Sequence, residues 1–211
     1  PNPTLIATNP DDGSIVRAKY QLGKEKLLIN IGRIAAEKNL TLLLKTFRYL
    51  IDRAEPDTLK LMIVGEGPEL ENLIQQAKEL GLSDQVIFTG LIAPAEVPLY
   101  LAAADLFVMT SLSEVKPLSQ LEALAAGVPI VSVKAPGAND TIIHDHNGLL
   151  VEDRVETIGD TVLSLLKDTS RHTRYQAAAR QTAERYSHSK IASEYLELFQ
   201  TTIARHQQLN K

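Results

Sequence analysis

Short apolar runs alternate with segments of helical periodicity along the chain, and this alternation restricts the fold more than any other feature of the sequence. The apolar runs, which we interpret as buried strands, occupy residues 27–31, 59–64, 86–88, 106–109, 129–133 and 149–151. Apolar side chains at helical spacing occupy 40–54, 68–80, 94–104, 117–126 and, with breaks near 169 and 187, the segment from about 154 onward. Strands that alternate with helices form right-handed crossovers and a parallel sheet. We therefore expect an α/β fold: a three-layer Rossmann-like domain of about six parallel strands, with helices on both faces and further C-terminal helices.

The composition agrees with a buried parallel sheet and argues against nucleic acid as a partner and against a metal site. Apolar residues make up 44% of the 211 residues and aromatic residues only 5%, so the core should consist of Leu, Ile, Val and Ala. The formal net charge of −4 argues against a nucleic-acid partner, which calls for a basic face. The absence of Cys excludes disulfides and thiolate metal sites. The five histidines lack carboxylates at ligand spacing, so we expect surface histidines and no metal site.

The length of the chain fits one domain with a helical extension, so we expect residues 1–211 to form a single domain. Residues from 1 to about 24 are expected to be an N-terminal linker. No apolar run approaches the ~20 residues that span a bilayer, and the opening lacks the features of a signal peptide. We expect a cytoplasmic domain that belongs to a longer protein.

In a parallel sheet, ligands bind outside the carboxyl ends of the strands, so the loops that follow the strands are the candidate sites. The first such loop contains Gly32, Arg33 and Lys38. A glycine at a strand end lets a ligand approach the backbone, and two cations on one loop suit a diphosphate. The alternative is that Arg33 and Lys38 are solvated surface residues. From this loop alone both interpretations stay open.

The loop after the second strand, residues 65–68, is a tight turn into a helix with Pro68 as its first residue. It has neither the dinucleotide-binding fingerprint nor the lysine of a P-loop. We therefore favour plain strand–turn–helix geometry over phosphate binding for this turn.

The segment from 111 to 127 carries the largest number of candidate binding groups. Glu114 lies in the loop after the fourth strand, and Pro117 marks the start of a helix. Leu118 and Ser119 then present free backbone N–H groups at the positive end of that helix, which is an anion site. Glu122 lies one turn further and could accept hydrogen bonds from ribose hydroxyls, as Glu114 could from a sugar. The alternative is that both glutamates are exposed and only favour the helix start electrostatically.

With these segments in order, the sequence resembles the retaining glycosyltransferases built from two Rossmann-like domains (the GT-B fold), in particular their large family four. Members carry two glutamates with seven residues between them, as Glu114 and Glu122 have here. The following segment, 123–129, resembles the usual continuation, and 32–39 resembles the basic diphosphate loop. Further segments match in order, at 63–68, 88–90 and 104–106, and the similarity covers roughly residues 25 to 200.

The resemblance implies a role for each candidate residue. Arg33 and Lys38 would bind the diphosphate, Glu114 the donor sugar, Glu122 the ribose, and the residues around Leu91 would face the base. Such enzymes retain the anomeric configuration and use a nucleotide-diphosphate sugar as co-substrate, without a metal or other cofactor in the chemical step. The residues assigned to catalysis are Arg33, Lys38 and Glu114. Those assigned to nucleotide-sugar binding are Gly32, Gly65, Leu91, Leu118, Ser119 and Glu122.

The resemblance also implies partners and shows two departures. The donor would be a UDP-, GDP- or ADP-hexose, and the acceptor a lipid or a surface polysaccharide. The family usually has Gly where this chain has Pro117, which lacks a backbone N–H. The N-terminal acceptor domain is missing, so little or no turnover is expected. The helix at about 187–205 would cross to that domain, and the full-length protein would lie at the inner face of the membrane.

Two other functions stay open at this point. One is a non-catalytic nucleotide-binding or regulatory module of Rossmann-like fold, which Pro117 and the missing half favour slightly. The other is a sugar-nucleotide epimerase, which also uses paired carboxylates and a diphosphate site. The segment from Glu114 to Gly127 fits the transferases better than the epimerases.

Overall fold

A computed structural model describes residues 12–55, 57–113 and 118–209 and contains a six-stranded sheet in the order β3-β2-β1-β4-β5-β6. Each pair of neighbouring strands is parallel. The strands are β1 Lys26–Ile31, β2 Leu59–Val64, β3 Val86–Phe88, β4 Leu106–Met109, β5 Ile130–Val133 and β6 Gly148–Val151. The predicted fold class is therefore confirmed, and the strand order reverses between β1 and β4.

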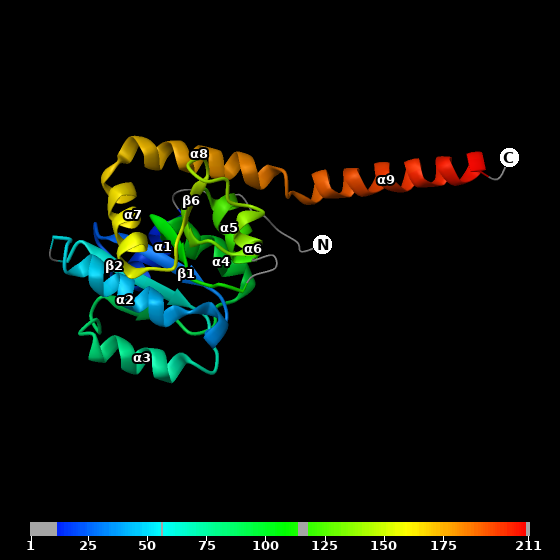
Figure 1. Cartoon of the computed structure of the whole chain (residues 1–211). Coiled ribbons are helices and arrows are strands. Elements are labelled where there is room, and N and C mark those ends of the chain that lie inside the picture. The colour runs from blue at the N-terminus through cyan, green and yellow to red at the C-terminus, as the bar shows by residue number, and fades with distance from the viewer. Residues whose placement is uncertain (1–11, 56, 114–117, 210–211) are drawn as a thin grey trace.

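Helices cover both faces of the sheet (Figure 1). They are α1 Gly13–Lys19, α2 Leu40–Ile51, α3 Leu70–Glu79, α4 Val97–Ala103, α5 Leu118–Ala126, α6 Pro136–Asn139, α7 Val155–Lys167, α8 Thr169–Glu184 and α9 His188–Leu209, with short 3₁₀ turns η2 Ala36–Lys38 and η3 Pro94–Glu96. Successive side chains of a strand point to opposite faces of the sheet, so the strands contribute to two apolar layers, one on each face. In β1, Leu28 packs with α2, α3 and α7, while Leu27 and Ile29 pack with α1, α4 and α5. Because both faces are covered, the strands are apolar on both sides, as expected of a parallel sheet.

The helix that follows β2 begins at Leu70, so the expectation that Pro68 is its first residue is wrong. The reason is that the preceding loop pairs with the loop after β1: the Ile34 N–H donates to the Glu66 carbonyl at 2.8 Å, and the Glu69 N–H donates to the Ile34 carbonyl at 3.1 Å. These bonds hold residues 66–69 in an extended and turning path. The helix can begin only after this pairing ends.

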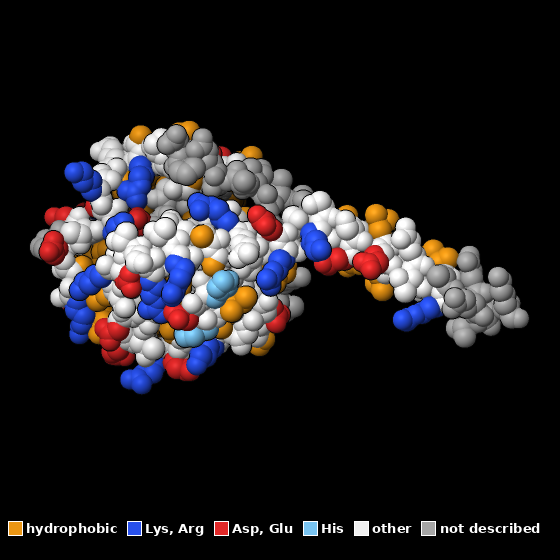
Figure 2. All heavy atoms as spheres, turned by 90° about the horizontal axis from the view of Figure 1, so that it is seen from above, with side chains coloured by type: hydrophobic (Ala, Val, Ile, Leu, Met, Phe, Trp, Pro, Cys, Tyr) orange, Lys and Arg blue, Asp and Glu red, His pale blue; other side chains and the backbone are white. Residues whose placement is uncertain are grey.

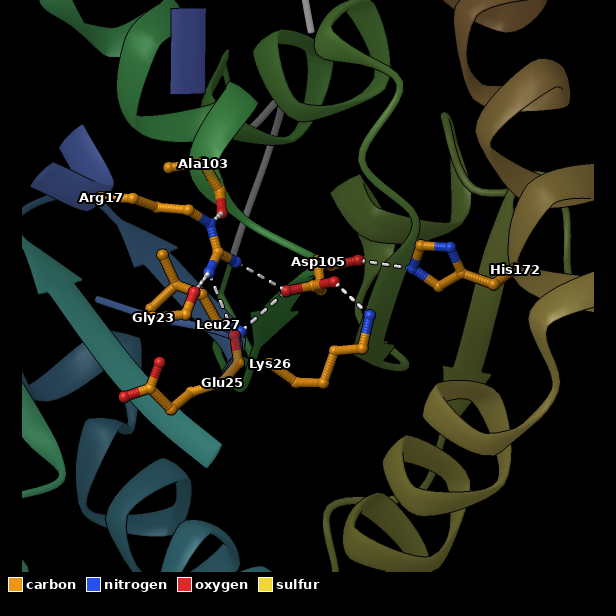
Figure 3. Close-up of polar contacts among 8 residues, drawn as sticks. All are labelled: Arg17, Gly23, Glu25, Lys26, Leu27, Ala103, Asp105 and His172. Atoms are coloured by element: carbon orange, nitrogen blue, oxygen red, sulfur yellow. Dashed lines mark hydrogen bonds and ion pairs between the residues drawn. The ribbon is translucent and has the colours of Figure 1, made fainter. Parts of the chain in front are cut away.

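The sequence analysis did not predict α1, which lies within the segment expected to be a linker; Figure 3 shows how Arg17 of α1 bonds to other parts of the domain. The Arg17 guanidinium donates to the Asp105 carboxylate at 3.0 Å and to the Ala103 carbonyl at 3.1 Å. The same carboxylate accepts from the Leu27 N–H at 2.9 Å, and the Asp105 carbonyl contacts the His172 ring at 2.7 Å. Asp105 thus joins α1, β1 and α8 at the amino ends of the strands, opposite the candidate site.

Helix α9 extends away from the sheet as an arm (Figure 1), and hydrophobic side chains are visible along it in Figure 2. Five large apolar side chains of α9 are exposed by more than half of their surface: Tyr195, Leu196, Leu198, Phe199 and Ile203. Across residues 12–55, 57–113 and 118–209, no helix combines the length and the apolar character that crossing a bilayer requires.

Removal of the Asp105 carboxylate is expected to destabilise the domain strongly. The side chain is only 16% exposed and accepts from a backbone N–H and from two cations, Arg17 and Lys26, so Asp105→Ala should lower the free energy of unfolding by about 3 kcal/mol. Urea unfolding measures the loss. The control is Asp52→Ala, at an ion pair whose carboxylate is 56% exposed, which should cost under about 1 kcal/mol. Equal losses at the two positions would contradict this account of Asp105.

Candidate functional site

A cavity of about 610 Å³ opens at the carboxyl ends of the strands, at the switch point between β1 and β4. Every predicted site residue that the structure describes lines this one cavity: Gly32, Arg33, Lys38, Gly65, Leu91, Leu118, Ser119 and Glu122. Glu114 and Pro117 lie outside the described residues. The structure therefore brings together cations from the loop after β1 and the start of α5, which the sequence places about 80 positions apart.

The loop after β1 is fixed by backbone pairing with the loop after β2. The Gly32 N–H donates to the Val64 carbonyl at 3.0 Å, and the Ile34 N–H continues the same pairing one step further. Arg33 stands between these two bonded residues. Its backbone is therefore held on both sides, and its side chain starts from a fixed position at the rim of the cavity.

The glycines of the second loop allow this close pairing. A Cβ on Gly65, whose φ is +131°, would lie 2.0 Å from the Gly32 carbonyl oxygen, and a Cβ on Gly67 would lie 2.1 Å from the Ile34 carbonyl oxygen. No side chain fits at either distance. Gly65 lines the cavity, and its missing side chain makes room for another loop, as expected of plain turn geometry.

The far end of the first loop is held from β4. Thr110 and Ser111 follow β4 directly; the Thr110 hydroxyl donates to the Lys38 carbonyl at 3.1 Å, and the Ser111 hydroxyl donates to the Glu37 carbonyl at 2.9 Å. Both side chains are buried. The loop that carries Arg33 and Lys38 is thus bonded to β2 at its start and to β4 at its end.

Asn30 is a lining residue that the sequence analysis missed. It is buried, and its amide donates to the Val108 carbonyl at 2.7 Å. The register of β1 with β4 ends at Ile29 and Phe107, so the Asn30 side chain continues the connection where the backbones separate. A signal was present: Asn30 is a polar residue inside an otherwise apolar strand, placed one residue before its end.

The opposite wall of the cavity is the start of α5. Leu118 and Ser119 begin this helix, whose first backbone N–H groups have no partner within the helix and carry partial positive charge. Glu122 lies one turn further and is half-buried, and burial raises the pKa of its carboxyl above the ordinary value. A desolvated carboxylate at this place favours ligands that donate hydrogen bonds, such as hydroxyl groups.

The remaining wall is mostly apolar. Leu91, 71% exposed, stands there with Ile92, Pro94 and Val97, and this surface suits a flat ring. Glu66 adds a carboxylate that the sequence analysis did not assign to the site. Within the described part of the chain, no group of three or more His, Cys, Asp or Glu side chains could hold a metal ion. Chemically, the cavity offers two cations and a helix start to an anion, a carboxylate to hydroxyls and an apolar wall to a ring.

The chain is similar to a known family and to several characterised proteins. The family described as "Glycosyl transferases group 1" matches residues 14–182. An alpha-monoglucosyldiacylglycerol synthase of Streptococcus pneumoniae is 38% identical over 151 residues, 71% of this chain and 34% of that protein. A GDP-mannose-dependent alpha-(1-6)-phosphatidylinositol monomannoside mannosyltransferase of Mycobacterium tuberculosis is 35% identical over 174 residues, 79% of this chain and 45% of that protein.

A solved structure extends the likeness to almost the whole chain. Anabaena Alr3699/HepE in complex with UDP and glucose matches with a TM-score of 0.83 and 25% identity, covering 93% of this chain and 54% of the other. The curated relatives are longer than the region of likeness, and the chain spans between a third and a half of their length.

The raised pKa of Glu122 predicts a stability effect with a defined sign. A carboxyl whose pKa is higher in the folded than in the unfolded chain costs stability once pH rises above the unfolded value of about 4.3. Glu122→Gln should therefore raise the free energy of unfolding at about pH 7, and the gain should shrink toward zero near about pH 4. Urea unfolding across this range measures it.

The control for this measurement is Glu184→Gln, at an exposed position of α8, which should show little gain at any pH in the range. A Glu122→Gln chain that is less stable than the unmodified chain at neutral pH would show that the carboxylate is not penalised by burial.

Proposed function

Because the chain belongs to the family of group 1 glycosyl transferases, we propose that it is the donor-binding half of a retaining glycosyltransferase, which moves a hexose from a nucleotide-diphosphate sugar to an acceptor. The observation that carries the proposal is the convergence of Arg33, Lys38 and the start of α5 on one cavity. A diphosphate needs several positive groups around it, and this cavity provides them from two elements.

The proposed roles follow the chemistry of each group. Arg33 and Lys38 bind the diphosphate and stabilise the negative charge that the nucleotide gains as the sugar leaves it. Glu122 accepts hydrogen bonds from the ribose, and Leu91 lies against the base. Glu114, outside the described residues, is proposed to hold the sugar hydroxyls on the strength of the family resemblance. No bound cofactor is part of the proposal, since the nucleotide sugar is a co-substrate.

The base of the donor is proposed to be uracil or guanine. The Anabaena structure holds UDP and glucose, and the mycobacterial relative is GDP-mannose-dependent. The binding test below also includes ADP, so that adenine is tested as a third base. The named relatives are glycosyltransferases, which supports sugar transfer over epimerisation.

The acceptor is proposed to be a lipid. The two curated relatives are named for monoglucosyldiacylglycerol and for phosphatidylinositol monomannoside, which are both lipids. Acceptor binding is proposed to belong to an N-terminal half, within the share of the relatives' length that the matched region does not span, so the chain alone should turn over little. Peripheral contact with a membrane would then be a property of the longer protein.

We also propose that α9 crosses to that half. The arm extends away from the sheet (Figure 1). Among the described residues, none of its exposed apolar side chains belongs to or packs against either core layer. Tyr195, Phe199 and Ile203 recur at four-residue spacing and so share one stripe of the helix. An apolar stripe of this kind is expected at an interface.

The donor site predicts selective loss of nucleotide binding. Isothermal titration of the chain with UDP, GDP and ADP should detect binding of one of them, and Arg33→Ala or Lys38→Ala should weaken it by about tenfold or more, since each removes a charged hydrogen-bond donor. The control is Lys134→Ala, at an exposed ion pair with Glu152 away from the cavity, which should leave binding unchanged. No heat with any of the three nucleotides would overturn the proposal.

If α9 contacts the N-terminal half, a change on its apolar stripe should have an effect only in a protein that carries both halves. In a protein that carries both halves, Phe199→Asp should reduce sugar transfer and thermal stability, because a carboxylate would be forced into an apolar interface. In the present chain the same change should alter stability by less than about 0.5 kcal/mol. Thr201→Asp, on the opposite side of the helix, is the control. Unchanged transfer with Phe199→Asp would show that α9 does not lie at the interface.

A further inference from the structure

Two buried hydroxyl groups connect the η2 turn, which carries Lys38, to the end of β4. We propose that Thr110 and Ser111 are positioning residues, which hold the η2 turn against the end of β4 and thereby set the place of Lys38 relative to the diphosphate. The inference rests on the proposed donor site, because it assigns a function to the position of a residue in that site.

The contacts are specific to the end of the loop. The Thr110 hydroxyl reaches the Lys38 carbonyl at 3.1 Å, and the Ser111 hydroxyl reaches the Glu37 carbonyl at 2.9 Å. Thr110 is 0% and Ser111 1% exposed, so the two hydroxyls themselves are closed to solvent, and the bonds they make are part-buried. A part-buried carbonyl that loses its donor loses a hydrogen bond that water restores only incompletely, so removal of a hydroxyl should loosen the turn.

The turn needs an external support. Its own bonds are local: the Lys38 N–H donates to the Ala35 carbonyl, and the Asn39 N–H donates to the Ala36 carbonyl. The turn then ends at Asn39 in the left-handed conformation with φ of +50°, which asparagine adopts more readily than most residues other than glycine. A single 3₁₀ turn has poor hydrogen-bond geometry and is weak by itself. The two hydroxyls supply bonds from a rigid strand of the sheet.

The position of these residues explains why they would act on the donor site. They follow β4, on the other side of the switch point from β1, and Ser111 also lines the cavity. They therefore fix the η2 turn, and with it the backbone of Lys38, against the end of β4. Because a diphosphate must contact both walls at once, a shift of the turn weakens binding even when the fold stays intact.

A double-mutant cycle separates this role from a structural one. Titration with UDP and GDP should show about tenfold weaker binding for the chain with Thr110→Val and Ser111→Ala together. In a Lys38→Ala background the same pair should cost less than about twofold, because the hydroxyls act through Lys38. Thr110→Ser keeps the hydroxyl and should restore most of the affinity lost in Thr110→Val. The proposal is overturned if the paired change lowers nucleotide affinity equally in the unmodified chain and in the Lys38→Ala chain, or if it lowers affinity in neither.

Thr46 offers a matched control. It is also a buried threonine, but within the described residues its hydroxyl has no hydrogen-bond partner, and it lies on α2 outside the cavity. Thr46→Val should leave nucleotide affinity unchanged. If the double variant fails to fold, the single changes Thr110→Val and Ser111→Ala take its place in the cycle, with about threefold expected for each.

Hydrogen exchange in the absence of nucleotide tests the hold on the turn independently of the donor site. The backbone amides of residues 36–39 should exchange about fivefold faster in Thr110→Val than in the unmodified chain, while those of β1 stay unchanged. Unchanged exchange at 36–39 overturns the proposal. If the unmodified chain binds neither UDP nor GDP, the proposed function fails, and this measurement alone decides whether the hydroxyls hold the turn.

Discussion

The backbones of the loops after β1 and β2 lie against each other at a distance that no side chain could share, and the cavity depends on this contact. A Cβ on Gly65 or Gly67 would stand about 2 Å from a carbonyl oxygen of the first loop, at Gly32 and Ile34 respectively. The pairing holds the backbone of Arg33 at the rim of the cavity. It also occupies the residues after β2, so α3 begins only at Leu70. One contact between two backbones therefore decides both where a cation stands and where a helix begins.

The other parts of the site can be understood as extensions of this fixed loop. Asn30 bridges to the Val108 carbonyl where β1 and β4 separate, and the Thr110 and Ser111 hydroxyls hold the loop's far end. At the opposite end of the strands, Asp105 ties α1, β1 and α8 together (Figure 3). Because both ends of the sheet are held rigidly, the positions of the two cations relative to the start of α5 are fixed before a ligand binds. Electrostatic preorganisation requires such fixed positions.

Much of the fold could be predicted from the sequence because parallel strands buried on both faces are continuous apolar runs. The bounds of β2, β3 and β4 match those expected from the runs at 59–64, 86–88 and 106–109. Helix α1 was missed because it buries only Gly13 and Val16 and depends on Arg17 contacts with Ala103 and Asp105, distant in the sequence. The strand-end rule and the family resemblance led to a set of site residues whose described members line one cavity, whereas Asn30 and Glu66 needed the geometry of loops that meet only in three dimensions.

The central claim is that the cations of the first loop and the first turn of α5 surround one diphosphate. A crystal structure of the chain with UDP or GDP, whichever binds more tightly, tests it directly. The account predicts that the diphosphate lies within hydrogen-bond distance, about 3 Å, of both the Arg33 guanidinium and the backbone N–H of Leu118 or Ser119. A nucleotide bound elsewhere, or in this cavity with its diphosphate turned away from Arg33, would contradict it.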